Sequence, residues 1–191
     1  MGRGTRDDRS STPGSPGPGT LPRFFELLRK LCEKEVEFVI IGGFAVILHG
    51  HVRATKDVDI VPSTSPANVE RLWEALVELE AVPGEIEGLR PEDMPVAFGK
   101  EGLLHGGNWI LYTTQGCLDL MPYVADADGE IPFAELRESA VRVDLEEIGH
   151  PIWVASVGQL ISMKEHANRD IDRIDVSALR MILRLEDAGA Q

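Results

Sequence analysis

Residues 38–60 read FVIIGGFAVILHGHVRATKDVDI, and this stretch decides the fold. The stretch begins within a short apolar run, Val36 to Ile41. The length of this run and its β-branched residues predict a buried strand. Gly42-Gly43 ends that strand, and residues 44–48 predict about two helical turns. The acidic pair of Asp57 and Asp59 follows. The sequence therefore predicts a strand, a glycine turn, a short helix and an acidic second strand.

The acidic strand presents two carboxylates on one face, because residues i and i+2 of a strand point the same way. Asp57 and Asp59 would share that face, with Val58 and Ile60 on the other. Two carboxylates held this close repel each other unless a cation lies between them. Paired oxygen ligands suit Mg²⁺, which keeps several waters and shares its remaining positions with substrate phosphates.

The glycine turn has a complementary chemistry. Gly42-Gly43 stands where a strand meets a helix, and free backbone N–H groups there favour an anion such as phosphate. Glycine also lets a phosphate approach the backbone closely. One stretch thus combines an anion site with a cation site, and a nucleoside triphosphate with Mg²⁺ needs both.

The order Gly42-Gly43, then Arg53-x-Thr55-x-Asp57-x-Asp59, resembles the signature of the DNA polymerase β-like nucleotidyltransferase superfamily. It looks closest to small bacterial and archaeal members, which include toxin-type enzymes of abortive-infection and toxin–antitoxin systems. The usual form has Gly-Ser where this chain has Gly-Gly, a form found in a subset. The resemblance leaves two roles open for Arg53 and Thr55, a phosphate contact or a local brace.

A third acid, Asp119, lies alone between two leucines in the apolar run 117–121. This run is predicted to be the returning strand of a hairpin whose first strand is 109–113. A lone acid on a buried strand is unfavourable unless it is paired or bound to metal. The resemblance implies that Asp119 is the third carboxylate of the site, on the strand beside the Asp-x-Asp strand, where it helps to hold a second metal or accepts the proton of the attacking hydroxyl. The alternative is an edge-strand aspartate that faces water.

The C-terminal part carries a second matching segment. Ser156 and Gln159 form a Ser-x-x-Gln capping box that predicts the start of a helix. The family pattern has a Lys on one helix, then Gly-Arg-x-x-Asp-x-x-Asp-x-x-x-Leu. The matching residues are Lys164, Arg169, Asp172, Asp175 and Leu179, with Asn168 in place of the glycine. The resemblance implies that Lys164 and Arg169 hold the triphosphate or nucleotide; the alternative is a structural ion pair between Arg169 and Asp172.

Composition bounds the class of protein. The chain has 191 residues and a formal net charge of -13, which argues against broad binding to a duplex backbone. Residues 1–20 are rich in Gly, Pro, Ser and Thr, and we expect a disordered tail there. Residues 21–191 are expected to form a single domain. No apolar run approaches the ~18 residues of a membrane span, and two cysteines, Cys32 and Cys117, favour a reducing, cytoplasmic location.

The expected fold class is α+β. We expect a small mixed or antiparallel sheet with the carboxylates on one face, helices packed behind it, and a helical C-terminal segment from about residue 156. Amphipathic helices are predicted near 23–34 and from Ser65-Pro66 to about 81. The segment 82–106 is interrupted by Gly and Pro and receives no assignment.

The function implied by the resemblance is metal-dependent nucleotidyl transfer. Mg²⁺, or Mn²⁺ in its place, would be held by Asp57, Asp59 and Asp119, with ATP or another nucleoside triphosphate as substrate. The acceptor hydroxyl would belong to tRNA, a protein or a cationic small molecule, and a cognate antitoxin would be a partner. The alternative is a catalytically idle nucleotide- or partner-binding module of the same fold.

Overall fold

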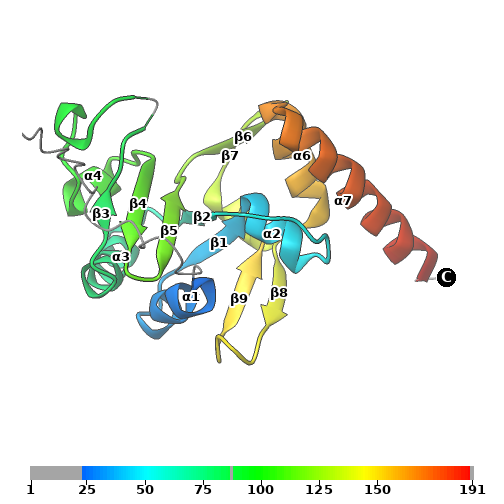
Figure 1. Ribbon diagram of the computed structural model, residues 1–191, viewed down its shortest axis with the longest axis horizontal. Coiled ribbons are helices and arrows are strands. Elements are labelled where there is room, and N and C mark those ends of the chain that lie inside the picture. The colour runs from blue at the N-terminus through cyan, green and yellow to red at the C-terminus, as the bar shows by residue number, and fades with distance from the viewer. Residues whose placement is uncertain (1–22, 87, 190–191) are drawn as a thin grey trace, which may run out of the picture.

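The computed structural model describes residues 23–86 and 88–189 (Figure 1). The helices are α1 (Phe24–Glu33), α2 (Gly42–Leu48), α3 (Pro66–Glu78), α4 (Lys100–Leu104), α5 (Phe133–Glu138), α6 (Val157–Ala167) and α7 (Asp170–Gly189), with a 3₁₀ turn η1 (Pro91–Asp93). The strands are β1 (Phe38–Ile41), β2 (Asp57–Pro62), β3 (Val82–Pro83), β4 (Trp109–Thr113), β5 (Gly116–Leu120), β6 (Val124–Asp126), β7 (Gly129–Ile131), β8 (Val141–Asp144) and β9 (Pro151–Val154).

The main sheet has seven strands in the order β3-β4-β5-β2-β1-β9-β8. Strand β2 runs antiparallel to β1 and parallel to β5, and β4 runs antiparallel to β5. Strands β6 and β7 form a separate hairpin. The expected α+β class with a mixed sheet is confirmed, with β3 at one edge of the sheet and β9 and β8 extending it at the other.

One face of the central strands forms the core. Val58 and Ile60 of β2 and Leu118 of β5 are fully buried and pack in one cluster with the apolar stripes of α1 and α3. All four residues of β1 are buried as well, which suits a strand with a neighbour on each side. The polar residues of β2 alternate with this apolar face, so burying the core turns Asp57 and Asp59 to the opposite face.

Several local sequence signals are confirmed. The capping box is present, with Ser156 Oγ accepting from the Gln159 N–H at 3.3 Å and Gln159 Oε1 accepting from the Ser156 N–H at 3.2 Å. Asn168 takes the left-handed conformation at φ 50°, ψ 32° and ends α6, as its replacement of a glycine predicted. The predicted helix and hairpin near residues 24–33 and 109–120 are also present.

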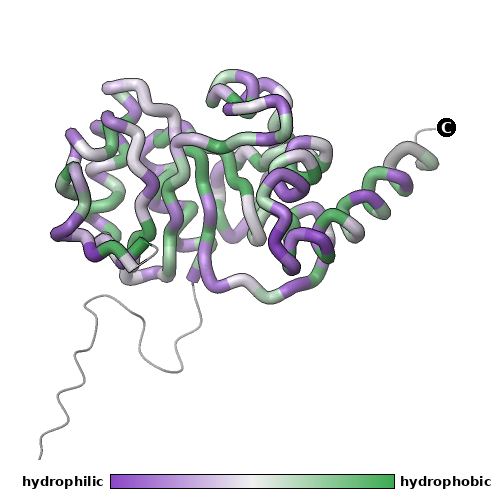
Figure 2. Tube along the Cα trace, turned by 90° about the horizontal axis from the view of Figure 1, so that it is seen from above, coloured by the Kyte–Doolittle hydropathy of each residue, from purple (hydrophilic) through white to green (hydrophobic). Residues whose placement is uncertain are grey.

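The helical C-terminal segment is confirmed and consists of α6 and α7. Helix α7 packs its first turns against α6, whereas its last turns extend away from the rest of the protein (Figure 2). The predicted tail, residues 1–20, lies outside the described residues. None of the helices described combines the length and apolar character needed to cross a bilayer.

Candidate active site

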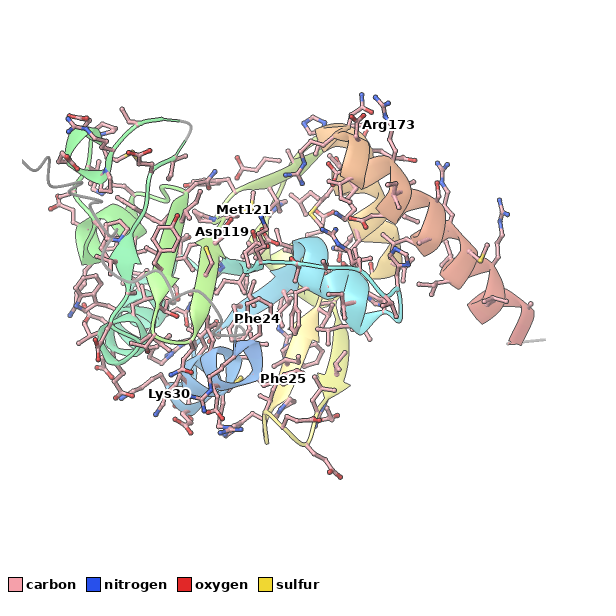
Figure 3. All side chains as sticks on the ribbon, viewed as in Figure 1. Phe24, Phe25, Lys30, Asp119, Met121 and Arg173 are labelled. Carbon is pink, nitrogen blue, oxygen red and sulfur yellow. The ribbon has the colours of Figure 1, made fainter. Side chains whose placement is uncertain are left out.

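The three predicted carboxylates lie together on one face of the sheet. Asp57 and Asp59 come from β2, and Asp119 comes from β5, which pairs with β2 in parallel. Asp59 is in register with Asp119, so their side chains point to the same face from adjacent strands. Figure 3 shows Asp119 near the middle of the molecule. The expectation that Asp119 stands beside the Asp-x-Asp strand is confirmed in placement, and the edge-strand alternative is wrong because β5 has a neighbour on both sides.

Burial and the neighbouring carboxylates disfavour the ionised forms of Asp59 and Asp119. Burial and the Asp57 carboxylate raise the pKa of Asp59 to about 6, despite the Gly43 N–H and the more distant Lys164 and Arg169. Burial, followed by the charges of Asp59 and Asp57, raises the pKa of Asp119 to about 7. Without a cation to offset their charge, Asp59 therefore gains a proton as the pH falls through about 6, and Asp119 as it falls through about 7.

Cys117 shares the face of Asp119, as the two-residue period predicted. Its Sγ donates to Asp119 Oδ1 at 3.6 Å. Burial and the Asp119 carboxylate raise the pKa of the thiol to about 12, so it stays protonated. The thiol fills space and supplies a weak donor to the third carboxylate.

The glycine turn fits tightly against Asp59. Gly42 has φ +65°, and a Cβ on it would lie 1.9 Å from Asp59 Oδ2. The Gly43 N–H donates to the same oxygen at 3.4 Å, and a Cβ on Gly43 would lie 2.9 Å from Thr55 Oγ1. The two glycines thus let the Asp59 carboxylate approach the start of α2. Their predicted contact with phosphate remains a prediction.

Arg53 and Thr55 brace the site locally. Thr55 Oγ1 donates to Asp57 Oδ1 at 2.9 Å and so orients this carboxylate. Arg53 donates through NH1 to Asp175 Oδ2 and links the loop before β2 to α7. Both side chains make the contacts of a brace, and their role toward phosphate remains a prediction.

Lys164 and Arg169 belong to an ion-pair network that includes Arg53 and is centred on the buried acids Asp172 and Asp175. Lys164 Nζ lies 3.1 Å from Asp172 Oδ1 and 2.8 Å from Asp175 Oδ2, and Arg169 Nε lies 2.7 Å from Asp172 Oδ2. Both aspartates are 0% exposed. The structural ion pair between Arg169 and Asp172, one of the two sequence interpretations, is therefore present.

Asp172 and Asp175 were not among the candidate site residues. Burial alone would raise the pKa of Asp172, but its bonds to Arg169 and Lys164 lower it below the usual value. Asp175 Oδ1 is buried and has no hydrogen-bond partner within the described part of the chain. The sequence signal was available, since acids at i and i+3 that share the buried face of an amphipathic helix require partners.

All nine predicted site residues line one cavity of about 590 Å³, a volume typical of small-molecule sites. These residues are Gly42, Gly43, Arg53, Thr55, Asp57, Asp59, Asp119, Lys164 and Arg169. The cavity lies between the carboxylate face of the sheet and the helices α6 and α7. Sequence reasoning missed the lining residues from the segments around β3, β4 and β5, among them Ile86, Asn108, Met121 and Tyr123.

The donor set fits a magnesium ion shared with substrate. No group of three or more His, Cys, Asp and Glu side chains is arranged as a complete metal site in residues 23–86 and 88–189. Mg²⁺ commonly binds one or two carboxylates and takes its other ligands from water and substrate phosphates. Burial and the neighbouring carboxylates raise the pKa values of Asp59 and Asp119, and a cation held between these carboxylates would offset that repulsion.

A nucleotidyltransferase family model matches the part of the chain that contains Asp57 and Asp59. Residues 19–93 match the family model described as "Nucleotidyltransferase of unknown function (DUF6036)". No curated protein matches the chain significantly. Neither result bears on the predicted toxin–antitoxin role, which stays a prediction.

Two solved structures share the fold. The lincosamide antibiotic adenylyltransferase LnuA, in its lincomycin-bound form, aligns with TM-score 0.56 and 17% identity over 84% of this chain and 96% of its own. ANT(2")-Ia in complex with adenylyl-2"-tobramycin aligns with TM-score 0.52 and 15% identity over 87% of this chain and 91% of its own. The protein is therefore similar to nucleotidyltransferases in sequence over residues 19–93 and in fold over most of its length.

Proposed function

We propose that the protein is a metal-dependent nucleotidyltransferase, which transfers a nucleoside monophosphate from a nucleoside triphosphate to an acceptor hydroxyl. The observation that carries this proposal is the register of Asp59 with Asp119 across β2 and β5. It brings three carboxylates to a cavity that also contains Lys164 and Arg169. Opposed anionic and cationic groups around one cavity suit a metal-bound triphosphate.

Asp57 and Asp59 would hold Mg²⁺, with Thr55 fixing the orientation of Asp57. When bound, the ion would neutralise charge on the triphosphate and orient it. Gly42 and Gly43 allow Asp59 to approach the helix start, because a side chain on Gly42 would overlap the Asp59 carboxylate.

Asp119 would accept the proton of the attacking hydroxyl. Its pKa of about 7 makes it an effective base near neutral pH. The hydroxyl oxygen bonds to the α-phosphorus, the bond from that phosphorus to the oxygen bridging to the β-phosphorus breaks, and pyrophosphate leaves with the electron pair. The proton moves to Asp119 and then to solvent.

Lys164 and Arg169 would contact the outer phosphates. Arg169 is partly exposed at the cavity, with 71% of its side chain accessible, and can reach toward a ligand while α7 stays in place. Lys164 is buried and would act through its fixed positive charge. Catalysis in this arrangement consists mostly of positioning and charge stabilisation.

The test is transfer of label from each of four α-labelled nucleoside triphosphates to tRNA, protein and small-molecule hydroxyl compounds, with Mg²⁺. Asp57→Asn should reduce transfer about 10³-fold, because it removes a metal ligand whose effect is worth several kcal/mol. Asp128→Asn, in the exposed turn between β6 and β7, is the matched control and should keep full transfer.

The outcomes separate the two functions considered. Magnesium-dependent nucleotide binding without transfer to any acceptor would favour the idle binding module. Equal transfer by the wild type and Asp57→Asn would overturn the proposal. Transfer confined to tRNA, together with neutralisation by a cognate antitoxin, would support the toxin–antitoxin role.

A further inference from the structure

The cavity has two chemically different sides. One side is formed by β2, α2, α6 and α7 and contains Arg53, Lys164 and Arg169. The other side lies beyond Asp119, where β4 borders β5 and Ile110 is in register with Asp119. Because directly opposed residues of an antiparallel pair share a face, Ile110 extends the row of Asp59 and Asp119 across the sheet.

The second side is defined here as the neutral wall, and its members are Ile86, Asn108, Ile110, Met121 and Tyr123. Apart from Asp119, none of the described lining residues from β4, β5 and the segments next to them is acidic, basic or histidine. The charged groups of the cavity are therefore confined to the carboxylates and to the basic side.

Local structure holds the neutral wall in place. The Met121 N–H donates to the Ile60 carbonyl at 2.9 Å, which continues the ladder beyond β5 and puts Met121 on the face of Asp119. Figure 3 shows the two side chains next to each other. A Cβ on Gly106 would lie 2.4 Å from Tyr123 Cε2, so the ring packs against bare backbone. Half of Tyr123 remains exposed and available for contact with a ligand.

We propose that the acceptor is an uncharged, largely apolar hydroxyl compound that binds on the neutral wall with its hydroxyl at Asp119. This inference rests on the proposed function, because Asp119 marks the side from which the hydroxyl attacks. The aromatic ring of Tyr123 and the thioether of Met121 offer apolar contact area, and the Asn108 amide offers one polar contact for orientation.

The same wall disfavours the charged acceptors. An ammonium group placed there loses hydration, and the wall residues Ile86, Asn108, Ile110, Met121 and Tyr123 offer it no counter-charge. Pairing with Asp119 would remove the proton acceptor. Among the described lining residues, a nucleic-acid acceptor would find no lysine or arginine on this side, and the formal charge of -13 repels its phosphates. The inference thus favours an uncharged small molecule over tRNA and a cationic small molecule, two of the acceptors that the sequence left open.

The experiment compares two probes that differ in one group, 2-phenylethanol and the 2-phenylethylammonium ion. Each is titrated into the full chain labelled with ¹³C at the methionine methyls, with Mg²⁺ and a non-hydrolysable ATP analogue present. Met121 reports on the neutral wall, Met163 of α6 on the basic side, and the exposed Met181 of α7 serves as the unaffected reference.

The alcohol should shift the Met121 methyl and leave Met181 unchanged, with an apparent Kd at least about 10-fold lower than that of the ammonium ion. Tyr123 is half exposed, so Tyr123→Glu should leave the fold intact. The added carboxylate should reverse the preference, so that the ammonium ion binds more tightly than the alcohol. Equal or tighter binding of the ammonium ion overturns the inference, as does an alcohol that leaves Met121 unshifted up to about 20 mM.

Failure of the proposed function gives a different result. The Mg²⁺–nucleotide complex should shift Met163 in the wild type and not in Asp57→Asn. If the complex shifts Met163 in neither protein, the nucleotidyltransferase proposal is overturned, and the acceptor inference that rests on it is overturned as well. If it shifts Met163 while the ammonium ion is the better ligand, only the acceptor inference is overturned.

Discussion

The contact between Gly42 and Asp59 shows how one residue limits the site. A Cβ on Gly42 would overlap the Asp59 carboxylate, and φ +65° is strained for any residue with a side chain. The carboxylate oxygen and the helix start can therefore meet only if the residue between them is glycine. The glycine at position 42 is therefore needed to accommodate the Asp59 side chain, whether or not a ligand is bound.

Gly42→Ala should lower the free energy of unfolding by about 2 kcal/mol or more, through strain and displacement of Asp59. Gly50→Ala is the matched control, since Gly50 also has positive φ (+98°) but no atom within 4 Å of its Cβ position. It should show the backbone penalty alone, about 1 kcal/mol, and keep magnesium-dependent transfer. Denaturant unfolding and transfer assays measure both, and equal effects of the two changes would contradict the proposed close contact.

The raised pKa of Asp119 makes the metal-free protein pH-sensitive. Its folded pKa of about 7 lies above the ordinary value of 3.8, so the folded state binds the proton more tightly than the unfolded state. Stability from this group is fully present below pH 4 and is lost as the pH rises through about 7. With EDTA present, Tm should fall between pH 5 and 7.5.

Asp119→Asn isolates this effect, because an amide does not titrate. The variant should have a Tm a few degrees above that of the wild type at pH 7.5 and nearly equal to it at pH 4, where the stability from the protonated Asp119 is still almost fully present. Differential scanning calorimetry at both pH values provides the measurement. A wild type and a variant whose Tm values change in parallel would show that Asp119 ionises as an ordinary exposed acid.

At the scale of elements, the ion-pair network fixes the helices α6 and α7 to the loop before β2. Lys164 reaches from α6 to Asp172 and Asp175 of α7, and Arg53 reaches Asp175 from the sheet side. The basic side of the cavity is therefore made by the packing of these elements, and its cations are held by buried acids rather than by solvent.

Lys164→Met should lower the free energy of unfolding by about 3 kcal/mol, because it leaves Asp172 and Asp175 buried with less compensation. Lys100→Met, which removes an exposed pair with Glu70, should change it by less than about 1 kcal/mol. Urea unfolding of both variants compares the two. A loss for Lys164→Met no greater than that for Lys100→Met would mean that the network contributes nothing to the packing of α6 on α7.

At the scale of the whole molecule, the formal charge of -13 acts on stability as well as on partners. Charges of one sign repel in the compact state, and salt screens that repulsion.

Raising NaCl from about 10 mM to about 200 mM should raise Tm by a few degrees. MgCl₂ at equal ionic strength should raise Tm further, because it also neutralises the carboxylates at β2 and β5. Asp57→Asn should respond to NaCl like the wild type and lose the additional magnesium effect. If MgCl₂ raises Tm beyond NaCl by the same amount in both proteins, the magnesium ion does not bind at Asp57.

Local signals in the sequence determined the elements of this protein. The alternation of Asp57, Val58 and Asp59 set which residues face the core, and the capping box and Asn168 set the limits of α6. Periodicity and capping depend on residues a few positions apart, so they can be read along the chain. The segment 82–106 gave no such signal, because its elements are two to five residues long.

Tertiary structure decided what those elements bring together. The register of Asp59 with Asp119, the ion pairs of Lys164, and the neutral wall beside Asp119 join residues far apart in the chain. Such pairings depend on strand order and on which face each element buries, and neither follows from local propensity. The sequence by itself determined the acids and cations of the site. Only packing around one core decided which of them are paired, and which side of the cavity stays uncharged.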